Sequence, residues 1–591
     1  MKKNKYIGIV MLAAGMFAAT SCSDYADYNE VPVDNSGAGS QTLWENISQD
    51  NQLSDFADLV KRTGFDSYLN TPRSLTIWAP VNGSFDKSVY DNMSDENVLK
   101  QFVKSHIAEY GHLATGKIDE RVRMLNDKSF EFSGEGSYTF DGISVSQPNL
   151  PSSNGVMHVI NGSARFLPNL YEYLKVGDSI NMLRDHFMRY ESVTLDTKAS
   201  VKGPMVNGIQ TYVDSVMVTS NSLINQLNAR LTNEDSSYTF ILPTDKAFQE
   251  MYDRIKPYYN FISATKVHDV ENYSSASATN TKTSPTINAS YMTDSLVRRT
   301  IIRNLVYSNN DMYNQWLVGK GEFLDTVRST TRNKFSNPKE LLETNTIGEP
   351  IRMSNGYGRL VDSLAFYHWE TFCPDLVFEP RHYMVKLFPA SAQMSTIRTY
   401  NPDGSPLTWL FGEDTELTEY RFGWISPGGD RVKPEFFIAL PNVMSTTYNF
   451  YVVFMPSSIS YGGGGVDNRP NWLNFQLNYC TAKGATETYC FSKAYADALL
   501  SGDKLPAIPT SVGTTTAFKN DPSKTDTVFI GRFTFPVNYS GLGDEYYPSL
   551  RVSSPISVLN DTQLATYSRD VRIAAILLRP VELEEFEAKN K

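Results

Sequence analysis

Residues 74–85 read Ser74-Leu-Thr-Ile-Trp-Ala-Pro-Val-Asn-Gly-Ser-Phe85, and the rest of the chain can be ordered around them. The apolar run at its start predicts a buried strand, which Pro80 ends because proline has no N–H to offer a neighbouring strand. Asn82 is a residue type that caps helix N-termini, so we expect it to cap a following helix. Phe85 would then pack back on the strand from the first helical turn.

A second segment, further along the chain, reads Ser153-Asn-Gly-Val-Met-His-Val-Ile-Asn-Gly-Ser-Ala-Arg-Phe-Leu-Pro168. Its Asn154-Gly155 pair predicts a turn, because glycine accepts a positive φ without steric cost. The apolar residues that follow predict another buried strand, closed by a proline.

Together the two segments resemble the two signature segments of the fasciclin (FAS1) domain family. The matching residues are Thr76, Ala79, Pro80, Asn82 and Phe85 in the first, and Asn154, Gly155, His158 and Ile160 in the second, with Asn161 where the family has Asp. The resemblance implies an α+β domain over residues 41–174 that carries little recognisable chemistry.

The same order of features recurs in a diverged form, which indicates an internal duplication. Ser237-Tyr-Thr-Phe-Ile-Leu-Pro-Thr-Asp-Lys-Ala-Phe248 repeats the strand, the proline, the capping residue and the phenylalanine. Ser354-Asn-Gly-Tyr-Gly-Arg-Leu-Val-Asp-Ser363 repeats the closing segment. We therefore predict a second fasciclin-like domain over residues 175–380, in tandem with the first.

The second copy is longer, and most of the excess fits a low-complexity stretch at residues 262–290. A run of Ser, Thr, Ala and Asn cannot bury a core, so we expect an exposed, mobile insertion there. Either a bound partner orders it or it is a tolerated surface insertion.

Residues 381–591 change character, with short β-rich segments separated by Gly, Pro and Asn turns. The expected strands are Phe436–Leu440, Asn449–Met455, Leu473–Tyr479, Thr527–Phe535, Ser549–Val552 and Val571–Leu578. Repeated short strands of this kind predict an antiparallel β-sandwich. The whole fold class is thus α+β: two tandem FAS1-like domains, then a sandwich.

The N-terminus is predicted to be a lipoprotein signal peptide over residues 1–21, with lysines followed by an apolar run too short to span a bilayer. Ala19-Thr-Ser-Cys22 resembles a bacterial lipobox, which implies acylation of Cys22 and anchoring in outer-membrane lipid. The acidic residues after Cys22 resemble the surface-export signal of Bacteroidetes lipoproteins. Residues 22–40 are then a flexible tether on the cell surface. An ordinary secretory signal is the alternative.

Three tryptophans, Trp409, Trp424 and Trp472, lie in or beside Pro/Gly-rich stretches and are candidate stacking platforms for a sugar ring. The alternative is that they plug the ends of the sandwich core. Cys480 and Cys490 flank an expected hairpin and could bridge adjacent strands in an exported protein. The alternative is two buried thiols.

Other chemistry is not indicated. His106 occupies the place of a histidine that the family pairs with tyrosine, but Ser105 replaces the tyrosine, so we expect a structural histidine. No nucleophile elbow, zinc motif or calcium loop is present, and we expect no catalytic residue, metal or cofactor. A net charge of −11 disfavours nucleic acid as a partner.

These patterns predict a non-enzymatic binding accessory on the cell surface. It would capture a glycan or another nutrient, in complex with a TonB-dependent outer-membrane transporter and its lipoprotein. The alternative is an adhesin that mediates cell–cell or cell–matrix contact through a protein ligand.

Overall fold

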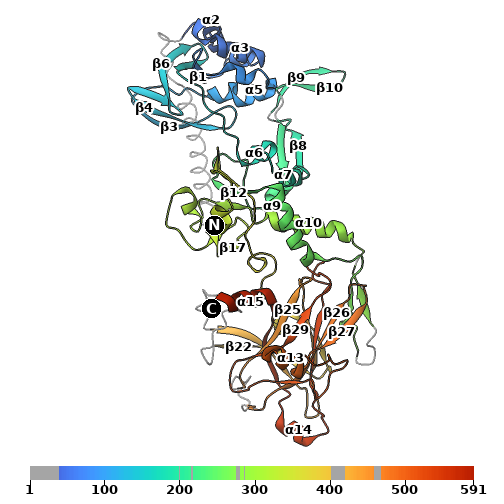
Figure 1. The fold of residues 1–591 in the computed structure, drawn as a ribbon. Coiled ribbons are helices and arrows are strands. Elements are labelled where there is room, and N and C mark those ends of the chain that lie inside the picture. Colours follow the sequence, from blue (N-terminus) through green and yellow to red (C-terminus); the bar gives the residue numbers. More distant parts are fainter. Residues whose placement is uncertain are drawn as a thin grey trace, which may run out of the picture. The chain divides into compact units, whose positions relative to one another are not determined.

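A computed structural model describes residues 39–590, apart from 199, 215–216, 275–279, 285, 401–418 and 458–466. The described residues form two compact units (Figure 1). The first contains residues up to Tyr173 together with 231–237 and 352–356, and the second contains the remainder. The predicted signal peptide, Cys22 and most of the tether lie outside the described residues, and so does Trp409.

The first unit has a seven-stranded sheet in the order β2-β1-β7-β6-β5-β4-β3. Its strands are β1 (Leu75–Pro80), β2 (Ile107–Glu109), β3 (Lys117–Arg123), β4 (Ser129–Glu135), β5 (Ser137–Phe140), β6 (Ile143–Ser152) and β7 (Gly155–Ile160). Its helices are α2 (Leu43–Gln49), η1 (Asn51–Leu53), α3 (Ser54–Arg62), α4 (Asp66–Leu69), η2 (Lys87–Tyr90), α5 (Asp95–Gln101) and η3 (Val103–His106), and α6 (Leu170–Val176) begins here.

Strand β1 lies between β2 and β7 and is buried on both faces. It pairs in parallel with β7, with Leu75 opposite Gly155 and Pro80 opposite Ile160. Because side chains alternate along a strand, Ile77 faces the helical core while Trp78 packs into a second aromatic core. The buried strands predicted within the two signature segments, which are β1 and β7, are therefore confirmed.

The Asn154-Gly155 pair serves two different purposes. Asn154 Oδ1 accepts from the Leu43 N–H at 2.8 Å, and its Nδ2 donates to the Leu69 and Thr71 carbonyls. Gly155 adopts φ +157°, and a Cβ there would lie 2.1 Å from the Leu75 carbonyl oxygen. Asparagine thus ties the first helix to the sheet, and glycine lets β7 approach β1.

Asn82 was predicted to cap a helix that follows it, and this prediction was wrong about which helix it caps. Its Oδ1 accepts from the Asp55 N–H at 2.9 Å, in the first turn of α3, which precedes it in the chain. No α-helix follows β1 directly, since the next helix is the short η2. Phe85 does pack on the helical core, with its ring 5.0 Å from that of Phe102.

Two of these contacts recur with residues of the later signature segments. Asp245 Oδ1 accepts from the Met182 N–H at 2.7 Å, in the first turn of α7 (Asn181–Met188). Asn355 Oδ1 accepts from the Leu170 N–H at 2.9 Å, and its Nδ2 donates to the carbonyls of Leu231 and Asn233. Asp245 therefore acts toward α7 as Asn82 acts toward α3.

After α6 the chain forms a mixed region that contains a four-stranded sheet in the order β15-β12-β19-β18. The strands of this region are β8 (Glu191–Leu195), β9 (Val201–Val206), β10 (Ile209–Asp214), β11 (Met217–Asn221), β12 (Tyr238–Pro243), β13 (Lys266–His268), β14 (Thr281–Thr283), β15 (Val306–Ser308), β16 (Val327–Arg328), β17 (Lys334–Phe335), β18 (Ile351–Met353) and β19 (Gly356–Val361). Besides α7, its helices are α8 (Ser222–Gln226), α9 (Asp245–Ile255), η4 (Lys256–Tyr259), α10 (Ala289–Ile302), η5 (Gln315–Val318), η6 (Glu340–Thr344) and η7 (His368–Glu370).

The segment 262–290, which was expected to be an exposed insertion, is only partly exposed in its described residues. Val267 and Val270 are each only 2% exposed. The Lys266 N–H donates to the Cys480 sulfur at 3.3 Å, and the Tyr273 ring packs against Phe437 with centroids 4.9 Å apart. These few apolar side chains fix the segment against the C-terminal sheet, although the composition around them is polar.

The C-terminal region contains two six-stranded sheets, and the strand pairs described in them are antiparallel. One has the order β22-β23-β31-β25-β29 with β20 beside β31, and the other has β21-β24-β30-β26-β27 with β28 beside β26. The strands are β20 (Leu376–Phe378), β21 (Met384–Phe388), β22 (Gln393–Tyr400), β23 (Glu419–Ser426), β24 (Glu435–Ala439), β25 (Thr447–Phe454), β26 (Trp472–Cys480), β27 (Thr486–Cys490), β28 (Phe518–Lys519), β29 (Asp526–Thr534), β30 (Ser549–Ser553) and β31 (Val571–Pro580). The helices are α11 (Pro380–Tyr383), α13 (Lys493–Ser501), α14 (Asp561–Thr566) and α15 (Val581–Asn590).

The disulfide expected between Cys480 and Cys490 does not form, and both cysteines are free and buried. They do lie on the two strands of a hairpin, but Cys480 pairs with Thr486 while Cys490 pairs with Gln476. This register separates them by about 13 Å along the strands, far beyond the roughly 7 Å that a bridge spans. The alternative of two buried thiols is what the structure shows.

Candidate functional site

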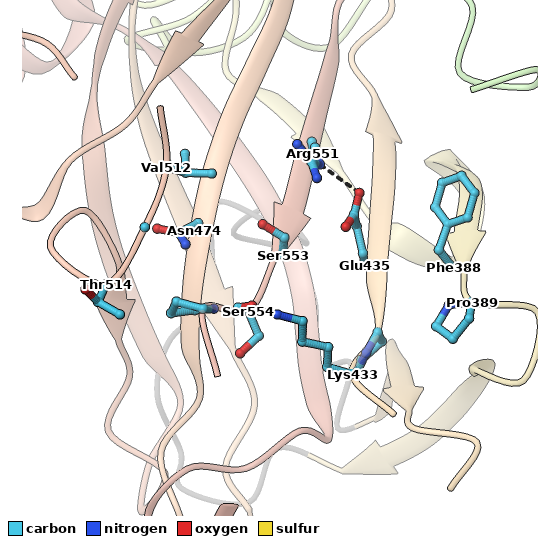
Figure 2. Close-up of a pocket in the computed structure, with 13 residues that line it drawn as sticks. Phe388, Pro389, Lys433, Glu435, Asn474, Val512, Thr514, Arg551, Ser553 and Ser554 are labelled. Carbon is cyan, nitrogen blue, oxygen red and sulfur yellow. Dashed lines mark hydrogen bonds and ion pairs between the residues drawn. The ribbon is translucent and has the colours of Figure 1, made fainter. Parts of the chain in front are cut away.

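A cavity of about 460 Å³ lies in the second unit, over strands β24, β30 and β26 (Figure 2). Its volume is in the range of small-molecule sites. The lining residues are Phe388, Pro389, Lys433, Pro434, Glu435, Asn474, Val512, Gly513, Thr514, Arg551, Ser553, Ser554 and Pro555.

The alternation of the strands places polar side chains at this cavity. Arg551 is opposite Gln476, and Ser553 is opposite Asn474, in the pairing of β30 with β26. Their neighbours Val552 and Phe475 point to the other face, where they are fully buried. The sheet therefore has one apolar face for the core and one polar face for the cavity.

Arg551 is held in place by two neighbours. Its Nε donates to Glu435 Oε1 at 2.8 Å and its Nη1 to Gln476 Oε1 at 3.0 Å. Burial acts to lower the pKa of Arg551, but the hydrogen bond and charge of Glu435 outweigh it and the pKa is raised. The guanidinium stays charged and fixed in orientation.

Lys433 enters the cavity from the residues just before β24. Its Nζ donates to the carbonyls of Ser554 at 2.9 Å and Ile556 at 3.1 Å. Burial lowers the pKa of Lys433, with Glu435 acting against this and Arg551 adding to it. The ammonium is thus bound by neutral groups while a second cation lies nearby.

The other walls are apolar or neutral. Phe388 packs against Tyr273 and Phe437, with ring centroids 6.0 and 6.2 Å away. Asn474 is 3% exposed and its Oδ1 accepts from the Thr516 hydroxyl at 2.7 Å. The arrangement combines a fixed aromatic wall with fixed hydrogen-bonding groups, which is the chemistry of a site that binds a polar organic molecule.

Of the three predicted tryptophans, the two that the structure describes, Trp424 and Trp472, lie in different sheets. Trp472 is on β26, two residues from Asn474 on the same strand face, and it packs against Tyr567 with centroids 4.7 Å apart. Lys519 Nζ lies 5.7 Å from the Trp472 ring. Trp472 does not line the cavity, although Ser554, which does, donates to its carbonyl.

Trp424 lies on β23, in the other six-stranded sheet, with the Arg572 guanidinium 5.8 Å from its ring.

The sequence patterns did not predict Lys433, Glu435 and Arg551 as site residues, because they come from separate parts of the chain. A signal was present in the alternation of Asn474, Gln476 and Asn478 along one predicted strand, which marks a polar sheet face.

Within the described ranges, no cluster of His, Cys, Asp and Glu is arranged to hold a metal ion. No helix in those ranges has both the length and the apolar character needed to cross a bilayer.

His106 is a structural histidine in the first unit. Its Nδ1–H donates to the Phe102 carbonyl at 2.8 Å, and its Nε2 accepts from the Ala164 N–H at 3.0 Å. It is fully buried, and both ring nitrogens are occupied. Burial lowers the pKa of His106 and of His158 to about 4.

These histidines predict acid sensitivity of the first unit. Between about pH 6.5 and pH 4 the unfolded chain binds protons that the folded unit rejects, so the free energy of unfolding falls as the pH falls. The expected loss is about 2 kcal/mol per histidine at pH 5 relative to pH 7.5. Denaturant unfolding of the parent and of His106→Gln at both pH values measures it. An unchanged pH dependence in the variant would contradict the assignment.

Comparison with known proteins identifies part of the chain. The model of the Fasciclin domain family matches residues 51–163. Stabilin-1 of Homo sapiens is 23% identical over 144 residues, and Stabilin-1 of Mus musculus is 24% identical over 144 residues. Each match covers 22% of this chain and 6% of the relative.

A solved FAS1 domain pair from the insect cell adhesion molecule Fasciclin I is also similar. It is 13% identical and covers 55% of this chain and 97% of its own, with a TM-score of 0.18.

Proposed function

From the premise that residues 51–163 form a fasciclin domain, we propose that this protein is a non-enzymatic binding protein of a bacterial cell surface. It captures a glycan or related nutrient beside an outer-membrane transporter, and the cavity of the second unit is its binding site. Fasciclin domains are associated with adhesion and binding roles in related proteins.

The observation that carries this proposal is the fixed lining of the cavity. A sugar presents an apolar ring face and a rim of hydroxyls, which Phe388 and the polar side chains around it can meet together. Phe388 is held by two aromatic rings and Arg551 by two hydrogen bonds. Binding a ligand would therefore cost little side-chain conformational entropy.

Two features of the architecture belong to the same proposal. The polar contacts of Asn355 and Asp245 repeat those of Asn154 and Asn82, which supports a second fasciclin-like domain over 175–380. The apolar inner faces of the two six-stranded sheets support a β-sandwich over 381–591.

Affinity electrophoresis of the purified protein in gels containing plant and host polysaccharides tests the site. We expect retardation by at least one glycan, weakened about tenfold by Phe388→Ala because the stacking wall is lost. Phe323→Ala is the matched control, since Phe323 is 41% exposed and does not line the cavity. No retardation by any glycan, together with aggregation of cells that carry the protein, would favour the adhesin instead.

The anchor is proposed from the sequence around Cys22. Growth with a labelled fatty acid should label the parent protein and not Cys22→Ala, because the acyl chains attach to that cysteine. The label is read on the immunoprecipitated protein, and protease treatment of whole cells then reports whether it faces outward. Equal labelling of parent and variant would rule out this lipidation site.

A further inference from the structure

We propose that the cavity binds a sugar that bears a carboxylate, such as a uronic acid residue of a polysaccharide, with its carboxylate between Lys433 and Arg551. This rests on the proposed function and specifies the ligand class of the same site.

The charges at the cavity are not balanced. The chain carries a net charge of −11, yet the ionisable groups of this cavity are two cations and one carboxylate. Glu435 forms an ion pair with Arg551, in which Glu435 Oε1 is 2.8 Å from Arg551 Nε. In the described part of the chain, Lys433 makes no ion pair, and its two hydrogen bonds go to neutral carbonyls. One positive charge at the cavity therefore lacks a counter-ion.

Lys433 and Arg551 also have hydrogen-bond donors left over. A lysine ammonium has three donors, and a guanidinium has five. The described contacts use two of the three on Lys433 and two of the five on Arg551. Both side chains also border the same cavity (Figure 2). A carboxylate is an acceptor-only group that can accept from both cations at once.

The electrostatics around Lys433 also favour a bound anion. The Lys433 ammonium is partly desolvated and lies near the charge of Arg551, and both effects disfavour its charged form. The charge of a bound carboxylate would offset both effects, because an opposite charge stabilises a buried cation. The rest of the lining suits a sugar ring, with Phe388 and Pro389 on one side and Asn474, Ser553 and Thr514 for hydroxyls.

Isothermal titration of the purified full chain with galacturonate and glucuronate oligomers, and with the neutral galactose and glucose oligomers, tests the proposal. We expect uronate oligomers to bind at least tenfold more tightly than neutral ones. Lys433→Met should weaken uronate binding by about tenfold to a hundredfold, the effect of one hydrogen bond to a charged group, and should weaken neutral binding much less, so that the preference for uronates shrinks.

Lys433→Arg keeps the charge and should retain the preference for uronates, which guards against a folding defect in Lys433→Met. Lys483→Met, an exposed lysine of the β26–β27 turn, is the matched control. Equal binding of uronate and neutral oligomers would overturn this inference and leave the proposed function standing. Binding of inorganic phosphate as tightly as uronate would overturn the sugar class, and binding of none of these probes would overturn both proposals at this site.

Discussion

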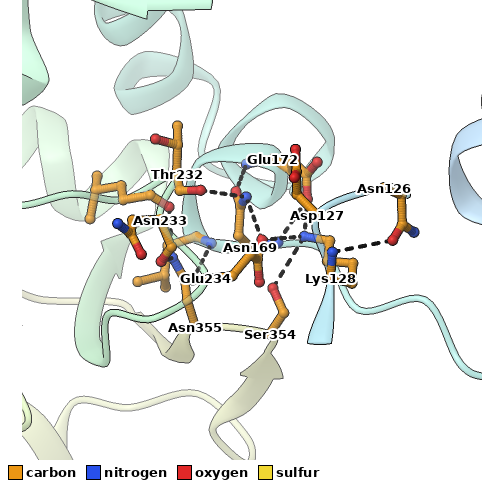
Figure 3. A network of polar contacts seen from close by, with 12 residues as sticks. Asn126, Asp127, Lys128, Asn169, Glu172, Thr232, Asn233, Glu234, Ser354 and Asn355 are labelled. Atoms are coloured by element: carbon orange, nitrogen blue, oxygen red, sulfur yellow. Dashed lines mark hydrogen bonds and ion pairs between the residues drawn. The ribbon is translucent and has the colours of Figure 1, made fainter. Parts of the chain in front are cut away.

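Replacing Lys128 by methionine should lower the free energy of unfolding of the first unit by about 3–5 kcal/mol. The Lys128 ammonium is 2.7 Å from Glu172 Oε2, 2.7 Å from Glu234 Oε1 and 3.2 Å from the Ser354 hydroxyl (Figure 3). Its side chain is 3% exposed, and that of Glu234 is 9% exposed. Removing the cation would leave two carboxylates close together and poorly solvated.

The control for this experiment is Lys100→Met. Lys100 also pairs with Glu172, but its side chain is 49% exposed, so we expect a loss of less than about 1 kcal/mol. Hydrogen exchange of the β1 and β7 amides in increasing urea follows the first unit separately from the second. A loss below 1 kcal/mol in Lys128→Met would show that water replaces the lysine and that the network contributes little.

Gly155→Ala is expected to destabilise the first unit by about 3 kcal/mol, the upper part of the usual range for overpacking. The added Cβ would lie 2.1 Å from the Leu75 carbonyl oxygen and 2.9 Å from Leu43 Cδ1. The carbonyl belongs to the backbone of β1, so relief of the clash requires β7 to move away from β1 and weakens their pairing.

Gly83→Ala separates this clash from simple backbone strain. Gly83 has φ +74°, and nothing lies within 4 Å of its added Cβ, so only the cost of a left-handed conformation remains, about 1 kcal/mol. Thermal and urea unfolding of both variants measure the difference. If the two substitutions cost the same, the close approach of Gly155 to Leu75 is not what constrains this position.

The sequence was sufficient for local features and insufficient for those that depend on register. Each of the six expected C-terminal strands is present, because alternation and turn residues are local signals. The partner of Asn82 could not be predicted, since it lies 27 residues earlier in the chain and is reached only through the tertiary fold. The separation of Cys480 from Cys490 likewise depends on which residues of the hairpin pair.

The candidate site shows the same limit. Lys433, Asn474 and Arg551 are unremarkable singly, and they meet because β24, β30 and β26 are neighbours in a sheet whose order differs from the chain order. The tryptophans were predicted as ligand-binding residues from the sequence, yet Trp472, which lies on this sheet face, packs against Tyr567 and does not line the cavity. Sheet order decides which polar side chains share a face.

The parallel pairing of β1 with β7 also determines when the first sheet can form during synthesis of the chain. Residues 75–80 are made long before residues 155–160, and the two strands can pair only when the later one is available. A nascent chain that ends before Gly155 therefore leaves one edge of its most apolar strand uncovered, which is a hazard for association with other chains. Such non-local closure is intrinsically slow. Ribosome-bound chains truncated before and after residue 160 should thus differ sharply in their need for a holdase chaperone.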